Sequence, residues 1–357
     1  MTLRRLAPLL VRGRATACGY LSAALLVPVL LAGSQAAAAA RTPRQLLESA
    51  VRGSRSIAYT GELMSVSWED GLTVATTYAV EQPRNAGLVV RPLVGDQPDG
   101  GDPVVASAAR LAPLPAAADR DPAELVTALL DKYRARVTGH DALLDRAVTR
   151  VEILRRDDDR LAERWWLDDD TGLVLRRESF GGGEEPVRLS SWLSLELARS
   201  RRPAAAARAE GPEPVDGRSL AALRAAGWAV PPTLPGRYAA EGVFAADDGA
   251  DVPLQVLYTD GLYGVSLFED RGRLDPGALP AGGVLDERLG WPAWSFPGQV
   301  PRRLVWEADG TTYTLVGDAP ADEMDALAQA LPQPSADGLP ARLGRGLGRL
   351  WSLVSPW

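Results

Sequence analysis

The segment ERWWLDDDTGLVLRRESF, residues 163–180, has the pattern of a β-hairpin. Two apolar stretches flank a run of aspartates and the pair Thr171-Gly172, which is typical of a tight turn. Two tryptophans, Trp165 and Trp166, stand side by side on the first strand. A metal site, a sugar-binding platform, the wall of a binding groove and ordinary sheet packing could each use them, so the rest of the chain has to decide.

The region around this hairpin predicts two helices and several antiparallel strands. Pro43, followed by apolar residues at helical spacing, predicts the first helix. Asp121 as the N-cap and Pro122 as the first helical residue predict a second helix over residues 122–137, with an apolar stripe that reaches Tyr133. Alternating apolar residues predict strands near residues 57–63, 74–80, 148–156, 161–167, 173–180 and 187–195, with a turn at Asp70-Gly71 between the first two.

A linker and a second, smaller region follow. Residues 199–214 are rich in Pro, Ala, Glu and Arg without an apolar period, which is typical of a linker. The expected elements after it are a short helix that ends at Gly227, strands near residues 238–245, 252–258, 263–269, 303–307 and 311–316, turns at Asp260-Gly261 and Asp309-Gly310, and a helix near 322–331.

This order of elements predicts an α+β fold in two domains. The N-terminal domain is expected over residues 41–198, as an antiparallel sheet packed on helices. The smaller C-terminal α+β domain is expected over residues 215–332.

Residues 1–40 have the composition of an export signal. A basic start is followed by an apolar run of about 15 residues, shorter than the roughly 20 that span a bilayer, and by an alanine-rich cleavage stretch. We therefore expect an exported, extracytoplasmic protein in the periplasm or cell envelope, with an uncleaved anchor as the alternative. Cleavage would remove four arginines, which changes the formal net charge from −7 to −11, and the single cysteine, Cys18. Such an acidic chain is a poor nucleic-acid ligand.

The last residues, 333–357, form a basic and partly apolar tail. Within 338–357, Arg342, Arg345 and Arg349 recur at helical spacing, and apolar residues can share the opposite face. This pattern predicts contact with a membrane surface. A frayed tail is the alternative, because glycine costs about 1 kcal/mol per residue in a helix relative to alanine.

The residue content speaks against most kinds of catalysis. The single histidine, His140, is expected in a surface loop, and the single lysine, Lys132, does not follow glycine as in a phosphate-binding loop. The acidic runs at 157–159 and 168–170 lack the spacing of a calcium loop, so we interpret them as solvated turns. A carboxylate pair of a glycoside hydrolase stays open, although nothing selects one. We predict no catalytic, cofactor-binding or metal-binding residue.

A binding protein remains. A sheet covered by helices leaves an apolar surface that suits a greasy ligand or a peptide, with core packing as the alternative for each side chain. The groove candidates are Tyr59, Met64, Trp68, Tyr78 and Trp165. For a protein partner, we expect an edge strand within residues 254–268 to add a partner strand, and its candidate contacts are Val256, Tyr258, Leu262, Val265 and Phe268.

Several segments resemble the RseB/MucB family of exported regulators of the sigma-E type envelope-stress response. The segments WLDDDTGLVLR (166–176) and YTDGLYGVSLFE (258–269) are the most specific, and RSIAYTGELM (55–64) and YTLVGDAPADEMDALAQAL (313–331) follow the same order. The similarity is collinear from about residue 42 to 331. One departure is ALLDRAV at 142–148, where Gram-negative members carry an Ala-Gly-Arg stretch.

The resemblance implies an N-terminal half-barrel similar to the lipoprotein carriers, with an apolar interior, beside a smaller C-terminal domain. Family members bind the exported part of a membrane-spanning anti-sigma factor and shield it from the first protease of a cascade, without catalysis or a cofactor. Lipidic envelope material is thought to release them. A GC-rich Gram-positive host would lack lipopolysaccharide, so the releasing ligand cannot be carried over.

These observations together predict a non-catalytic regulator that binds a membrane anti-sigma factor and tunes its proteolysis, with release by a lipidic ligand. The alternative is an envelope lipid or lipoprotein carrier that uses the same half-barrel. Because adjacent strand residues point to opposite faces, we expect Trp165, in phase with Glu163 and Leu167, to face the concave interior and Trp166 to face out.

Overall fold

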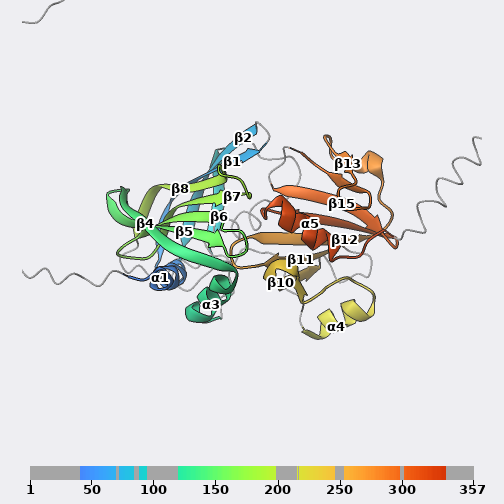
Figure 1. Ribbon diagram of the computed structural model, residues 1–357, viewed down its shortest axis with the longest axis horizontal. Coiled ribbons are helices and arrows are strands. Elements are labelled where there is room, and N and C mark those ends of the chain that lie inside the picture. Colours follow the sequence, from blue (N-terminus) through green and yellow to red (C-terminus); the bar gives the residue numbers. More distant parts are fainter. Residues whose placement is uncertain are drawn as a thin grey trace, which may run out of the picture. The chain divides into compact units, whose positions relative to one another are not determined.

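In the computed structural model, residues 41–69, 72–83, 88–94, 120–197, 215, 217–245, 253–297 and 301–334 are described (Figure 1). The predicted export signal (1–40), the turn at Asp70-Gly71, the linker (199–214) and the basic tail (338–357) lie outside these residues. None of the helices in the described part is long and apolar enough to cross a membrane.

An open antiparallel sheet forms the first half of the described chain, and we call it the first sheet. Its strand order is β3-β2-β1-β8-β7-β6-β5-β4. Because β3 and β4 at the two ends do not pair with each other, the sheet is not closed into a barrel. The bounds are β1 Tyr59–Glu69, β2 Leu72–Gln82, β3 Val89–Val94, β4 Tyr133–Leu143, β5 Arg146–Arg155, β6 Leu161–Asp168, β7 Val174–Phe180 and β8 Pro186–Leu197.

Two helices pack together with this sheet. Helix α1 (Pro43–Ser56) begins with a capping box between Thr42 and Gln45, and it buries Leu46, Leu47, Ala50 and Val51, as the apolar spacing predicts. Helix α3 (Pro122–Lys132) begins at Asp121, whose side chain accepts the backbone N–H of Ala123. Both helices contribute to the same large apolar cluster as the sheet.

The predicted end of the second helix is wrong. The helix ends at Lys132, and β4 starts at Tyr133, where the backbone is extended. The apolar positions 125, 129 and 133 continue the helical period across this boundary, and this hid the change of structure. His140 therefore lies on strand β4, although its side chain is exposed as expected.

A second antiparallel sheet, the second sheet, contains the remaining strands in the order β13-β14-β15-β16-β12-β11-β10-β9. The strand bounds are β9 Thr233–Leu234, β10 Tyr238–Ala245, β11 Leu254–Thr259, β12 Gly264–Arg271, β13 Val284–Asp286, β14 Ala293–Ser295, β15 Arg302–Ala308 and β16 Thr311–Gly317. Its helices are α4 Gly217–Ala225, η1 Pro235–Arg237, η2 Pro276–Ala278 and α5 Ala321–Gln329.

The prediction of an α+β fold is confirmed, with mainly antiparallel sheets and few helices. The predicted strands of both sheets and the closing helix are present, and Gly227 and Gly310 adopt the left-handed backbone expected of them. The strands β9, β13 and β14 were not predicted, because runs of two or three residues carry no alternation. The division into domains at residues 41–198 and 215–332 stays a prediction.

The two tryptophans of the opening segment lie in different environments. Trp165 is fully buried in the large cluster, together with residues of α1 and α3. Trp166 packs in a smaller apolar cluster, under the guanidinium of Arg176. Trp166 pairs with Arg176 on β7. Because alternate residues of a strand share a face, Trp166 lies on the same face as Arg164, as predicted. Trp166 is only 8% exposed, because the apolar residues of the smaller cluster and the guanidinium of Arg176 cover it.

The turn after β6 packs closely against α1, and this contact predicts a specific loss of stability. Gly172 has a φ of +76°, and a Cβ atom there would lie 2.5 Å from the carbonyl oxygen of Ser49. Gly310, at another hairpin turn, has a φ of +78° and open space around it. We expect Gly172→Ala to destabilise the protein by about 1–3 kcal/mol more than Gly310→Ala, because only the former must also displace a helix. Urea unfolding measures the difference, and equal losses would contradict the close packing.

Candidate functional site

The turn between β11 and β12, residues 259–263, is shaped by its own side chains. Asp260 Oδ1 accepts the backbone N–H groups of Leu262 at 2.9 Å and Tyr263 at 2.8 Å. Thr259 Oγ1 accepts the N–H of Gly261 at 3.0 Å and donates to the carbonyl of Tyr263 at 2.9 Å. Gly261 adopts a φ of +99°, which glycine supplies without strain. The predicted turn at Asp260-Gly261 is therefore confirmed.

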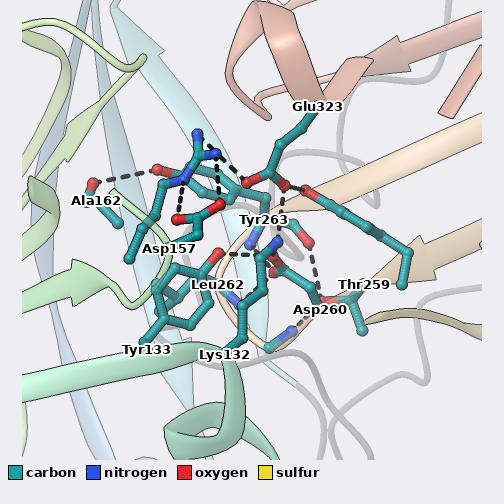
Figure 2. A network of polar contacts seen from close by, with 12 residues as sticks. Lys132, Tyr133, Asp157, Ala162, Thr259, Asp260, Leu262, Tyr263 and Glu323 are labelled. Atoms are coloured by element: carbon teal, nitrogen blue, oxygen red, sulfur yellow. Dashed lines mark hydrogen bonds and ion pairs between the residues drawn. The ribbon is translucent and has the colours of Figure 1, made fainter. Parts of the chain in front are cut away.

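The second oxygen of Asp260 binds the first sheet. Asp260 Oδ2 lies 2.5 Å from Lys132 Nζ and 2.7 Å from the hydroxyl of Tyr133 (Figure 2). Lys132 is the last residue of α3 and Tyr133 the first of β4, so the change from helix to strand positions both donors. The Asp260 side chain is fully buried. Each carboxylate oxygen thus has two hydrogen-bond donors.

Glu323, on helix α5, binds the same lysine. Its Oε2 lies 2.7 Å from Lys132 Nζ and accepts the hydroxyl of Tyr238 at 2.8 Å (Figure 2). Lys132 Nζ also lies 4.8 Å from the centre of the Tyr238 ring. Arg155 binds Asp322 at 2.9 Å and lies 3.7 Å from Glu323 Oε1. We call this set, Lys132, Tyr133, Arg155, Tyr238, Asp260, Asp322 and Glu323, the junction network.

Three further contacts run from the second sheet or its loops to the strands β6–β8. The hydroxyl of Tyr263 lies 3.0 Å from the carbonyl of Phe180 and 3.2 Å from that of Ala162. The carbonyl of Leu262 accepts from Arg177 at 3.0 Å. In addition, Arg188 on β8 binds Asp318, the residue after β16, with one contact at 2.7 Å. The residues 259–263 are therefore anchored through both side chain and backbone.

Apart from the exposed pair of Arg237 with Asp131, the charges of the ion pairs at this junction divide by sheet. The bases, Lys132, Arg155 and Arg188, belong to the first sheet and its helix. The acids, Asp260, Asp318, Asp322 and Glu323, belong to the second sheet and its helix. Such complementarity fixes which surfaces meet, because removal of either partner leaves a buried charge unpaired.

The three tyrosines of this region act as hydrogen-bond donors in their neutral form. Burial, strengthened by the nearby carboxylates of Asp260 and Glu323, raises the pKa of Tyr133, Tyr238 and Tyr263 well above the usual value. Their hydroxyls stay protonated at any physiological pH. The network therefore holds two parts of the chain together, and it presents no activated nucleophile or base.

Other polar residues singled out in the sequence also have structural partners. Asp168 is 1% exposed, accepts from Arg146 at 2.9 Å and from the backbone of Thr171 at 3.2 Å, so the prediction of a solvated turn is wrong for this residue. Asp157 binds Arg155. His140 Nδ1 lies 3.1 Å from Thr149 Oγ1. Among the described residues, no group of three His, Cys, Asp or Glu could hold a metal ion.

The five groove candidates do not line one surface. Tyr59 is buried edge-on against Trp192, with the ring centres 5.4 Å apart, and Tyr78 is half-buried beside the same cluster. Met64 is five positions from Tyr59 on a regularly paired strand, so Met64 and Trp68 point to the opposite face. Trp165 is a core residue with no exposed surface. The sequence pattern identified the aromatic residues, but their spacing along the strands, which places them on opposite faces, was not considered.

The predicted edge strand at 254–268 is wrong. Strand β11 pairs with β10 and β12, and β12 also pairs with β16, so neither can add a partner strand. Of the five predicted contacts, Val256, Tyr258, Leu262 and Val265 are buried in the core, and Phe268 is half-buried. The ends of the second sheet are β9 and β13 instead. The alternation of apolar residues within one strand does not report how many neighbouring strands pair with it.

Sequence reasoning missed the junction network as a site. From the sequence, Lys132 was used only to exclude a phosphate-binding loop, and Asp260 was interpreted only as a turn residue. One signal was available: the single lysine of an arginine-rich chain is followed directly by a tyrosine.

The sequence comparison bears on the same part of the chain. Residues 97–212 match the MucB/RseB N-terminal domain, and this range includes Lys132, Tyr133 and the strands β4–β8. This part of the chain is similar to the MucB/RseB N-terminal domain. The resemblance to the RseB/MucB family predicted from the sequence is thereby confirmed. No curated protein matches the sequence significantly.

Solved structures similar to this chain include MucB, with 17% identity, a TM-score of 0.48, and coverage of 82% of this chain and 98% of that one. The MucA/MucB complex of Pseudomonas aeruginosa gives 16% identity and a TM-score of 0.43, with 82% and 99% covered. A LolA superfamily protein from Nitrosomonas europaea gives 10% identity and a TM-score of 0.18, with 78% and 92% covered.

The junction network predicts how a single substitution changes the stability of the protein. Asp260→Asn keeps the oxygen that shapes the turn but removes the charge that faces Lys132. We expect a loss of about 3–5 kcal/mol in the free energy of unfolding, because a buried ammonium loses a partner. Asp159→Asn is the matched control: its exposed pair with Arg134 is worth about 0–1 kcal/mol, and asparagine tolerates its φ of +61°. Urea unfolding at pH 7 compares the two, and similar losses would contradict the role of Asp260.

Proposed function

We propose that this protein is an exported, non-catalytic regulator that binds the extracytoplasmic part of a membrane-spanning anti-sigma factor and tunes its proteolysis. The observation that carries the proposal is the match of residues 97–212 to the MucB/RseB N-terminal domain. MucB has been solved in complex with the periplasmic part of MucA, which is a precedent for a protein partner of this kind.

The ion pairs described above support a binding role rather than catalysis. The buried carboxylates Asp260 and Glu323 are each saturated by a lysine and a tyrosine, and a general acid or base needs a free position toward substrate. The single histidine lies on an exposed strand beside Thr149. We propose that the charged residues of the junction hold the two sheets in the arrangement that a partner binds.

Export follows from residues 1–40, whose basic start, apolar run and alanine-rich end fit a signal segment. Binding to an extracytoplasmic segment of a membrane protein requires that location. Contact of residues 338–357 with the membrane surface would keep the regulator near its partner.

An envelope lipid or lipoprotein carrier is the second candidate, and one observation favours it. The smaller apolar cluster around Tyr59, Leu63 and Val80 is separate from the large core, and Tyr78 and Trp192 at its border are half-buried. Half-buried aromatic side chains beside an apolar cluster suit an acyl chain. The same surface could also receive a lipid that releases the anti-sigma factor.

A pull-down from the host's own membranes with the tagged full-length protein distinguishes these two functions. We expect a membrane-spanning anti-sigma factor in near-stoichiometric amount by protein mass spectrometry, because a regulator has to hold its target until release. The untagged strain is the control. Recovery of lipids or lipoproteins without such a partner would contradict the regulator and support the carrier.

Protection from proteolysis is a second consequence. We expect the purified protein, added in excess, to slow cleavage of the anti-sigma factor's extracytoplasmic part by the first protease of the cascade. Quantification of the intact segment over time measures this effect. Cleavage at an unchanged rate, with binding demonstrated, would confine the function to binding alone.

A further inference from the structure

Glu269, near the end of β12, is a buried acid in which only one of the two carboxylate oxygens is hydrogen-bonded. Its side chain has no exposed surface, and its cross-strand neighbours are Leu254 on β11 and Tyr313 on β16. Oε2 accepts the backbone N–H of Ala229 at 2.8 Å. Oε1 has no partner among the described residues. A carboxylate placed in this way carries a charge that the fold does not neutralise.

The residue that Glu269 binds belongs to a segment that crosses the second sheet after α4. We call residues 226–231 the strap. Arg271 donates to the carbonyl of Ala226 at 2.6 Å and its guanidinium lies 4.7 Å from the Trp228 ring centre. The hydroxyl of Tyr258 donates to the carbonyl of Pro231 at 3.0 Å. Trp228 and Val230 of the strap are buried in the large cluster.

The groups around Glu269 offer little compensation for a negative charge. Tyr258 on β11 and Tyr313 on β16 are neutral, and burial raises the pKa of Tyr313 to about 12. Two charged groups lie nearby. Arg271, on the same strand, is hydrogen-bonded to the strap, and Arg224 of α4 donates to the carbonyl of Val230. Burial raises the pKa of Glu269 to about 7, against the smaller opposing effects of the Ala229 N–H and Arg271.

We propose that the strap is a proton-controlled latch, closed on the second sheet while Glu269 is neutral and released when Glu269 ionises. The neutral acid satisfies Ala229 and leaves no charge under Trp228. The ionised acid needs water at Oε1, and water reaches it only when the strap lifts and takes α4 with it. The proposal is independent of the anti-sigma partner.

The direction of the pH dependence follows from the raised pKa. A group whose pKa is higher in the closed form than in the open form favours the closed form at low pH. The closed form is therefore fully favoured below the ordinary glutamate pKa, and this preference is lost as the pH rises through about 7. Between these two pKa values the ratio of closed to open molecules falls by up to about tenfold per pH unit, and above about pH 7 it levels off.

Hydrogen exchange of the full chain between pH 5.5 and 8.5, corrected for the intrinsic pH dependence of exchange, tests the latch. We expect protection of residues 226–230 to fall by up to about tenfold per pH unit from pH 5.5 to about 7 and to level off above it, while strand β5 stays constant. In Glu269→Gln, which keeps an acceptor for Ala229 but cannot ionise, protection should not change with pH. Constant protection of the strap in the unmodified chain, or the same fall in the variant, would overturn the proposal.

A second measurement does not depend on the folding of the variant. The carboxyl carbon of Glu269 can be titrated by NMR in the unmodified protein. A midpoint near pH 7, at the pH where the fall in strap protection levels off, supports the latch. A midpoint below pH 5, or a midpoint near 7 without any change in the strap, sinks it.

Discussion

The buried carboxylate of Asp260 is the interaction on which the arrangement of this chain depends. One of its oxygens closes the turn at residues 259–263, and the other receives the ammonium of Lys132 and the hydroxyl of Tyr133. A single side chain thus couples local turn geometry to contact between segments 128 residues apart. Because a buried charge is tolerated only with its partners in place, the turn, the end of α3 and the start of β4 have to be correct together.

The same logic distinguishes the two buried acids of the second sheet. Asp260 has donors at both oxygens, whereas Glu269 has one donor and an oxygen without a partner. The first acid is a fixed structural element of the junction. The second acid is close to the balance between its two protonation states, since burial raises its pKa to about 7. Full and partial satisfaction of buried carboxyls therefore give one rigid and one adjustable contact on the same sheet.

Local features of this fold were predictable from sequence, and nonlocal ones were not. Helix α1 and the hairpin β6–β7 follow from apolar periodicity and turn residues, which act over a few positions. The α3–β4 boundary was missed because Tyr133 fits both a helical stripe and the first position of a strand. The partners of Lys132 lie more than 100 positions away, and the spacing of residues in one segment carries no information about them. The place of β11 between β10 and β12 is set by strand pairing, which the alternation within β11 does not report.

Lys132 is the only lysine of the chain, and its side chain is 14% exposed between two carboxylates. An ammonium held in ion pairs cannot act as an amine nucleophile, because its lone pair is bound to the proton. Acylating reagents would therefore modify Lys132 only in molecules whose sheets have separated. The amino terminus of the chain is the other amine that they would modify. The protein carries its own single-site chemical probe for the opening of the junction, and the extent of acylation at one residue would count the open molecules.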